Sequence, residues 1–306
     1  MDTITESRPF APIPTLDDLM KDNPKLRKED IDYLQSWMSK QPHLPKIPDE
    51  LLASFLHTNY YSLERAKNTI ENHFTIRTHA PELFTDRDIL APEAQKQLPL
   101  VQGAKFRKKD PEGNLVWAIR LMSGDASKVD FDACFKLGLM ILDQTIREDP
   151  TCSGHILIAD AKGTTMAHVA VLKLTTIKRF FKYVQEGLNV RLTAVHVINV
   201  SPVVDYVLQM FKPFFNKELM DKIHVHPGPV SELYKVVPQS ILPKDYGGDL
   251  DDMKEIYDYA VRSLEKHRQW FLDNEFLVDE KKRRGRSKNA TEIFGIEGSF
   301  KKLEID

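Results

Sequence analysis

The sequence predicts an α/β fold in which a small N-terminal helical bundle precedes a domain with a mostly parallel sheet. Residues 1–95 carry apolar side chains at helical spacing between short proline-containing loops, which is typical of a helical bundle. From about residue 98, β-branched runs alternate with helices, as in α/β layer structures. Residues 194–226 form the clearest unit, because a strand-like run, an apolar helix and a second strand-like run follow one another.

Four helices are expected in the N-terminal part. Thr15 and Ser62 are suitable capping residues for the first and the last of them, since a hydroxyl accepts a hydrogen bond from a backbone N–H of the first helical turn. Pro81 ends the last of these helices. The expected helices cover residues 16–22, 25–40, 49–57 and 62–78.

Strands and helices of the α/β part are expected in alternation. Residues 110–114, DPEGN, are a strong turn signal between the first two strands. Ser201-Pro202 opens a helix, because proline suits the first helical position. The expected strands cover residues 101–106, 115–121, 154–159, 194–200 and 222–226, and the other expected helices cover 130–148, 165–186 and 251–277.

Composition and charge exclude several classes of protein. The chain has 306 residues and a net charge of −2, whereas a general nucleic-acid binder is basic overall. No apolar run approaches the roughly 20 residues that span a bilayer, and residues 1–14 contain no apolar signal core. Cys134 and Cys152 have no metal or redox spacing and fit a reducing cytosol. We therefore expect a cytoplasmic protein without a metal or another cofactor.

The helix that begins at Pro202 is apolar on most of its circumference. Its polar stripe consists of Asp205, Gln209, Lys212 and Asn216. The helices over 130–148 and 165–186 are also apolar on more faces than one contact needs. A large apolar cavity between such helices and a sheet is one interpretation, and a core-facing helix of an ordinary α/β domain is the other.

The sequence contains no G-x-S-x-G, G-x-G-x-x-G, Walker or H-E-x-x-H motif. Asp160 ends a strand and His168 follows, a pair that an enzyme acting on a lipid could use, but no nucleophile accompanies them. His224 and His226 alternate on a strand in possible metal geometry, without a third ligand nearby. A structural role is the simpler interpretation of these residues, and we expect that the protein is not an enzyme.

Several ordered motifs carry a family resemblance. They are IADAKG (158–163) with His168, HVIN (196–199), MFKPF (210–214), KIHVH (222–226) and LPKDYGG (242–248). These motifs resemble the CRAL-TRIO (Sec14-like) lipid-binding family. The similarity is greatest to the branch of the α-tocopherol transfer protein, the cellular retinaldehyde-binding protein and clavesin. Residues 55–82 resemble the small helical domain that precedes the lipid domain, and residues 294–303 resemble the insect members of the branch.

The resemblance implies an intracellular carrier that holds one hydrophobic molecule, such as a retinoid, carotenoid, tocopherol or similar terpenoid, and exchanges it at membranes. Residues 202–220 would form a mobile gate helix. The chain would divide into a helical domain (1–95), a CRAL-TRIO lipid-binding domain (96–250) and a C-terminal helix with a tail (251–306). The implied pocket residues are Phe135, Gly138, Leu139, Leu142, Ile156, Ile158, Phe180, Tyr183, Val203, Val207, Met210, Phe211 and Phe214.

Close relatives in this family bind phosphoinositide headgroups through a basic patch near the gate. The matching positions here are Arg191, Lys217 and Lys222, whereas Thr193 and Glu218 stand where those relatives have basic residues. We expect a monomer that docks transiently on an anionic membrane surface and binds no nucleic acid. A phosphoinositide-sensing membrane-trafficking adaptor of the clavesin type is the alternative function.

Overall fold

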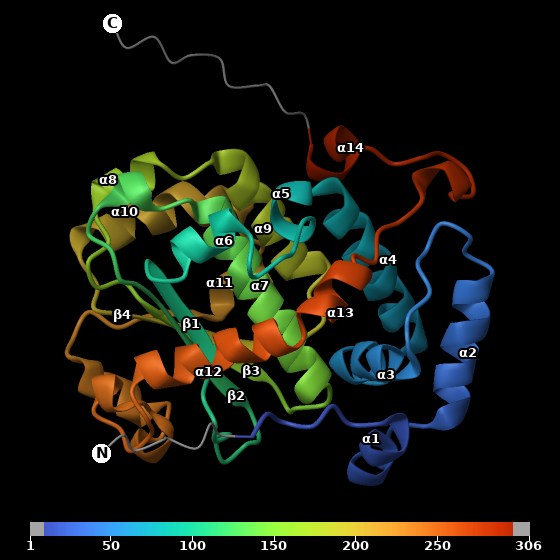
Figure 1. Ribbon diagram of the computed structural model, residues 1–306, viewed down its shortest axis with the longest axis horizontal. Helices are drawn as coiled ribbons and strands as arrows, with labels where there is room; N and C mark the ends of the chain where they lie inside the picture. Colours follow the sequence, from blue (N-terminus) through green and yellow to red (C-terminus); the bar gives the residue numbers. More distant parts are fainter. Residues whose placement is uncertain (1–8, 296–306) are drawn as a thin grey trace, which may run out of the picture.

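A five-stranded sheet lies at the centre of the structure, a computed structural model that describes residues 9–295 (Figure 1). The strands follow one another across the sheet in chain order, β1 pairs with β2 in the antiparallel direction, and all the other pairs are parallel. The mostly parallel α/β architecture expected from the sequence is therefore confirmed. The strands are β1 (Val101–Lys105), β2 (Leu115–Leu121), β3 (His155–Asp160), β4 (Leu192–Ile198) and β5 (Ile223–Val225).

The helices that connect the parallel strands lie on one face of the sheet. Crossover connections between parallel strands are right-handed, so strands laid down in chain order place their connecting helices on the same side. Trp117 of β2 and Leu157 of β3 pack on that side against Leu137. The connecting helices are α7 (Phe131–Glu148), α8 (Met166–Ala170), α9 (Leu174–Glu186), α10 (Pro202–Phe211) and α11 (Lys217–Asp221).

The other face of the sheet is covered mainly by irregular chain, with the start of the C-terminal helix that begins at Met253. Val116, Ile156 and Ile158 form a core there with residues of the 233–250 segment, which consists of short 3₁₀ turns. Side chains alternate between the two faces of a strand, so a shift of one residue moves a side chain from one core to the other. The two faces therefore carry two separate apolar clusters.

The N-terminal helices form a core of their own around Leu34, Leu52 and Phe55. Thr15 and Ser62 cap the first and fourth helices as expected. Two short helices were not predicted from the sequence, and each begins at a proline. The helices are α1 (Leu16–Asp22), α2 (Lys28–Ser39), α3 (Asp49–Thr58), α4 (Leu63–His79), α5 (Pro81–Phe84) and α6 (Pro92–Gln97).

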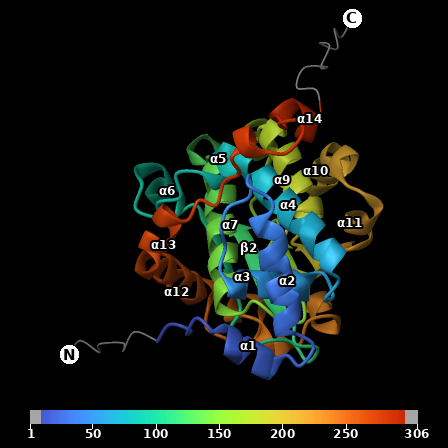
Figure 2. The ribbon, with the colours of Figure 1, turned by 90° about the vertical axis from the view of Figure 1, so that its right-hand side faces the viewer.

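The C-terminal part wraps around the molecule. The single helix expected over 251–277 is two helices, α12 (Met253–Lys266) and α13 (Arg268–Asp273), which lie on the opposite side of the molecule from α10 and α11 (Figure 2). The chain then returns to α4 and ends in α14 (Ala290–Phe294). Most of the 294–303 segment, which resembled insect members, lies outside the described residues.

The gate segment is not one helix, so the prediction of a continuous helix over 202–220 is wrong. Helix α10 ends at Phe211, a 3₁₀ turn covers Lys212–Phe214, and α11 follows. The break has a local cause, because Pro213 has no N–H to donate within a helix. Asn216 then caps the new helix, its Oδ1 accepting the N–H of Leu219 at 2.8 Å.

A buried charge cluster joins the N-terminal helices to α7. Arg77 of α4 donates to both carboxylate oxygens of Asp143, at 3.2 and 2.7 Å, and Nη1 of Arg87 donates to the same carboxylate at 2.5 Å. The two arginines are 2% and 1% exposed. Burial alone would raise the pKa of Asp143, but the charges of Arg77 and Arg87 outweigh burial and lower this pKa to about 2.

Four buried histidines are held neutral. Burial is the main cause in each case, and it lowers the pKa of His73 and His155 to about 3 and that of His57 and His196 to about 4. The nearby charge of Arg77 lowers the pKa of His73 further. His73 accordingly donates to the Gly187 carbonyl as a neutral ring, with an N···O distance of 2.8 Å.

We expect Asp143→Asn to destabilise the fold by about 3–5 kcal/mol, because it leaves Arg77 and Arg87 buried without a counter-charge. The free energy of unfolding in urea measures the effect. Asp205→Asn is the matched control, since Asp205 is exposed on α10, and it should change stability by about 0.5 kcal/mol or less. Equal effects of the two substitutions would contradict the structural role of Asp143.

The buried histidines predict that the fold loses stability as the pH falls from about 6.5 toward 4. In that range the histidines of the unfolded chain take up protons with a pKa near 6.5, whereas these histidines of the folded chain do not. Each histidine therefore lowers the free energy of unfolding by up to about 1.4 kcal/mol for each pH unit of acidification. Urea midpoints at pH 7.5, 6.5 and 5.5 measure the slope. His155→Gln should reduce the slope by about one quarter. A midpoint that stays constant from pH 6.5 to 5.5 would disprove the prediction.

Candidate functional site

Helix α10 is strongly apolar in composition, yet little of it is fully buried. Val204 is its only buried residue, and Tyr206 is 51% exposed. Its other apolar side chains are half-buried, namely Val203, Val207, Leu208, Met210 and Phe211. At its start, the Ser201 side chain makes no capping bond. The helix is therefore held to the body by few contacts for its composition.

Five phenylalanines connect α7 to α10 through α9. The rings of Phe135 and Phe180 stack with their centroids 4.6 Å apart, and Phe180 contacts Phe181 at 5.4 Å. Phe181 in turn contacts Phe211 at 5.4 Å and Phe215 at 4.6 Å. We call these five rings the aromatic row. Such edge and stacked contacts stabilise by about 0.5–1.5 kcal/mol each beyond the area they bury.

Open space adjoins α7 beside the aromatic row. A Cβ atom built on Gly138 would meet no heavy atom within 4 Å. Gly138 lies three residues after Phe135 and four before Leu142, so the three share one helix face. Both side chains are only half-buried. This face of α7 therefore has room beside it that its own side chains leave unfilled.

The structure brings some of the sequence-predicted pocket residues together. Phe135, Phe180 and Phe211 belong to the aromatic row, and Gly138 and Leu142 lie on the adjoining face of α7. Val203, Val207, Met210 and Phe214 are half-buried on α10 and the turn after it.

The structure places four of the predicted residues elsewhere. Leu139 and Tyr183 pack into the core with α4 and α5, and the Tyr183 hydroxyl lies 3.3 Å from Arg77. Ile156 and Ile158 point to the sheet face opposite the helices. Leu157, between them, faces α7, because successive side chains of a strand point to opposite faces of the sheet.

Two members of the aromatic row, Phe181 and Phe215, were missed as site residues. Phe181 directly follows Phe180, and adjacent side chains on a helix point about 100° apart. The pair could therefore have been predicted to contact two different neighbouring elements. No comparable sequence signal marks Phe215, because its position depends on the break of the helix at Pro213.

The Asp160 and His168 pair has separate structural partners. Asp160 accepts from the Lys162 backbone N–H at 3.0 Å and from Asn199 Nδ2 at 2.7 Å. His168 lies near Thr165 at its Nδ1 and near the Ser123 carbonyl at its Nε2. Each side chain thus stabilises the end of a strand or the start of a short helix.

Three histidines meet on β4 and β5. His196 Nδ1 lies 3.0 Å from His226 Nε2, and the rings of His196 and His224 stack with centroids 5.3 Å apart. Within residues 9–295, no group of three or more histidine, cysteine or acidic side chains has the geometry to hold a metal ion. The cluster joins the short β5 strand to the sheet.

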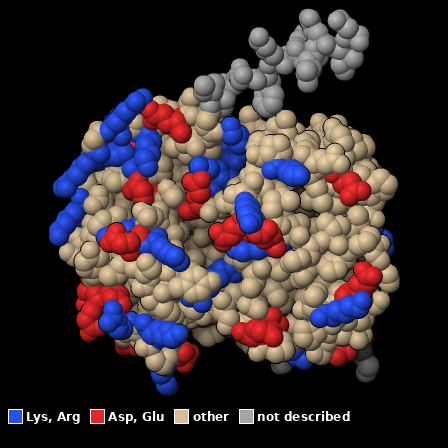
Figure 3. Space-filling view, turned by 180° about the vertical axis from the view of Figure 1, so that it is seen from behind, with Lys and Arg blue, Asp and Glu red and all other residues tan. Residues whose placement is uncertain are grey.

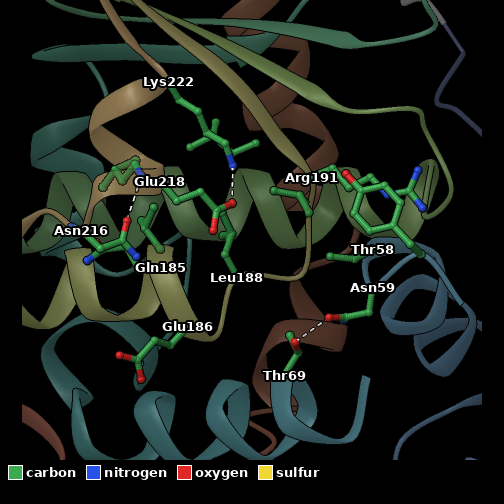
Figure 4. A pocket seen from close by; sticks show the side chains of 15 residues that line it. Thr58, Asn59, Thr69, Gln185, Glu186, Leu188, Arg191, Asn216, Glu218 and Lys222 are labelled. Atoms are coloured by element: carbon green, nitrogen blue, oxygen red, sulfur yellow. Dashed lines mark hydrogen bonds and ion pairs between the residues drawn. The ribbon is translucent and has the colours of Figure 1, made fainter. Parts of the chain in front are cut away.

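A second, polar pocket of about 200 Å³ lies between α9, α11 and the end of α3 (Figure 4). Arg191 and Lys222 of the predicted basic patch line it, whereas Lys217 is exposed outside its wall. Lys222 donates to Glu218 at 2.8 Å. The Arg191 guanidinium lies 4.1 Å from the centre of the Tyr60 ring and donates to the His57 carbonyl. With Glu186 also on the wall, the lining carries no net charge.

None of the helices within the described part of the chain is long and apolar enough to cross a bilayer.

Comparison with known proteins agrees with this geometry. Residues 104–248 match the family model described as CRAL/TRIO domain, and residues 23–94 match the one described as Pinta-like, UBA domain. The curated relatives include "Alpha-tocopherol transfer protein-like" of Homo sapiens and of Pongo abelii, each 26% identical over 76% of this chain and 69% of theirs. The Mus musculus protein of the same name is 25% identical over 76% of this chain and 68% of its own.

Among solved structures, the crystal structure of Sfh5 covers 83% of this chain and 99% of its own, with a TM-score of 0.50 and 15% sequence identity. That likeness concerns the fold alone. The matched segments coincide with the N-terminal helices and with the sheet and its connecting helices. Residues 104–248 therefore carry a CRAL/TRIO domain.

Proposed function

We propose that the protein binds one hydrophobic small molecule between α7, α9 and α10 and transfers it at membranes. The observation that carries the proposal is the exposure of α10, an apolar helix that buries only Val204. The open space beside Gly138 and the aromatic row supply an apolar surface opposite it. A ligand there would bury apolar side chains that are only half-buried by the protein itself.

The energetics fit reversible transfer. Burying apolar surface yields about 25 cal/mol per Å², so a ligand that hides a few hundred Å² gains several kcal/mol over water. A membrane gives the same ligand a similar gain, which makes exchange between protein and membrane nearly balanced. Helix α10 also gains when its exposed apolar side chains enter lipid, so opening is favoured at the membrane.

Apolar side chains are exposed on the same part of the molecule. Met166 on α8 and Val171 after it are 48% and 41% exposed, and Tyr206 on α10 is exposed as well. Few charged side chains lie over α8 and α10 in the view from behind, whereas lysines and arginines gather over residues 281–288 (Figure 3). We infer that the α8–α10 surface faces the membrane during exchange.

We infer a terpenoid-like cargo, such as a tocopherol, retinoid or carotenoid, because the aromatic row offers rings and few polar groups. The similarity to proteins named for α-tocopherol transfer supports this class. We also propose that the protein acts in the cytoplasm as a monomer, without covalent chemistry. The proposed domains remain residues 1–95, 96–250 and 251–306.

The alternative function, phosphoinositide sensing, is disfavoured by the charges of the polar pocket. Lys222 is engaged by Glu218, and Arg191 is directed to a carbonyl and a ring within the protein. A headgroup with several phosphates needs unengaged cations. We therefore propose docking on anionic lipid without selectivity for the headgroup.

Native mass spectrometry of the full chain, purified from its own source, tests the carrier proposal. We expect one apolar molecule per chain, released by solvent extraction. Gly138→Phe should reduce its occupancy about tenfold by filling the space beside α7. Gly138→Ala is the control: its methyl group fits, it should keep the cargo, and it should stabilise α7 by about 0.5–1 kcal/mol. A bound molecule unaffected by Gly138→Phe would refute this location.

Glu218→Lys should increase binding to anionic vesicles about fivefold or more, because one cation near such a surface contributes about 1 kcal/mol and the change also releases Lys222. Sedimentation with vesicles measures this binding. One set of vesicles contains phosphatidylserine, and a second set contains phosphatidylinositol bisphosphate at the same total charge. Glu265→Lys, an equal charge change on the exposed side of α12, should have a smaller effect. Strong bisphosphate selectivity of the unmodified protein would favour the adaptor function instead.

A further inference from the structure

A third pocket, of about 380 Å³, lies where the N-terminal helices meet α7 and the segment around α13. None of the residues proposed for cargo binding lines it, and neither does any residue of the polar pocket. Residues 13–15, which lead into α1, form part of its rim. Figure 1 shows how α3, α7 and α13 approach one another there. We call it the junction pocket.

The wall of the junction pocket is largely apolar. Leu51 of α3, Ile146 of α7 and Phe276 contribute side chains from three distant parts of the chain, and Trp270 of α13 closes one side. Small-molecule sites typically have volumes of about 300–1,000 Å³ and combine an apolar wall with a few polar groups. The junction pocket has both properties.

The charged side chains of the junction pocket are unevenly paired. Arg77, Arg147, Asp143 and Glu50 line it, so two guanidiniums face two carboxylates. Asp143 binds Arg77 and, from behind the wall, Arg87. Arg147 lies 4.1 Å from the centre of the Trp270 ring and donates to Gln144 at 2.8 Å. Among residues 9–295 it has no ion-pair partner.

Two deeply buried polar atoms on the wall have no partner. Arg77 and Asn189 are each 2% exposed, and neither Nε of Arg77 nor Oδ1 of Asn189 has a hydrogen-bond partner in the described structure. Asn189 uses its other terminus to donate to Ser54 at 2.6 Å. An unpartnered buried donor costs about 1–3 kcal/mol, so a ligand that satisfies it gains that amount.

We propose that the junction pocket binds an amphipathic monocarboxylate, of the chemical class of a medium-chain fatty acid. Its carboxylate accepts from Arg147 and from Nε of Arg77, and its apolar chain lies against Leu51, Ile146 and Phe276. The carboxylate supplies the counter-charge that Arg147 lacks. A dianion would be repelled more strongly by Asp143 and Glu50, and a neutral lipid would leave Arg147 without a counter-charge.

Quenching of tryptophan fluorescence by 11-bromoundecanoate tests the proposal on the full chain. Bromine quenches an indole only near contact, and Trp270 lines the pocket whereas Trp37 and Trp117 do not. We expect saturable quenching that is lost in Trp270→Phe. The corresponding alcohol, 11-bromoundecanol, should bind about tenfold more weakly because it cannot form charge-assisted bonds with the guanidiniums.

Three variants separate this site from the proposed cargo site. Arg147→Met should weaken bromoundecanoate binding about tenfold, and Arg147→Lys should restore part of it. Glu50→Gln, which removes a repelling carboxylate on the rim, should strengthen binding about threefold and provides a test if Arg147→Met is unstable. Gly138→Phe should leave the quenching of Trp270 unchanged.

Several outcomes would overturn the proposal. Quenching that persists in Trp270→Phe would place the acid beside another tryptophan. Equal binding of the acid and the alcohol, or no change in Arg147→Met and Glu50→Gln, would show that the guanidiniums do not recognise it. Loss of binding in Gly138→Phe would assign the acid to the cargo space.

Discussion

The ion cluster of Arg77, Asp143 and Arg87 is the constraint on which the arrangement of the molecule depends. It joins α4 of the helical bundle, the chain after α5, and α7 of the CRAL/TRIO domain at a single carboxylate. Two guanidiniums around one carboxylate are tolerated inside a protein when further contacts cover their planes and satisfy part of their remaining hydrogen-bonding groups. Arg77 lies over the Phe84 ring, Arg87 lies over Phe271, and Arg87 also donates to the Asn274 carbonyl. The cluster therefore fixes the relative positions of four parts of the chain.

The junction is held by many buried bonds whereas α10 is held by few contacts, and the proposed transfer would require this contrast. A carrier must open one wall without losing its fold, so the stabilising contacts belong on the elements that stay in place. Helix α7 is anchored by Asp143 and by two clusters of the core. Helix α10 has one buried side chain and is bounded by Ser201 at one end and by the Pro213 break at the other. In the proposed transfer, α10 would move about these ends while the sheet stays in place.

The sequence predicted the large features because they depend on local pattern. Period-two and period-3.6 spacing identified the five strands and most helices to within a few residues, and the caps at Thr15 and Ser62 form as expected. Site residues depend on which face a side chain occupies, and there one-residue errors matter. Ile156 and Ile158 were proposed from the family resemblance, and a fully apolar strand gives no pattern that tells which of its side chains face the helices, as Leu157 does. The partners of Arg77 could not be predicted, since they are 66 and 106 residues away in the sequence.

Helix α9 contacts both the junction and the proposed cargo site. Its inward side is fixed by Tyr183, which is fully buried and whose hydroxyl lies beside Arg77 and His73. Its outward side presents Phe181 to Phe211 and Phe215 at the end of α10. Because the two sides belong to one short helix, a change at the junction that shifts Tyr183 also shifts the ring against which α10 closes. A ligand that satisfies Arg77 would therefore influence the closure of α10 through packing alone, with no contact to the cargo.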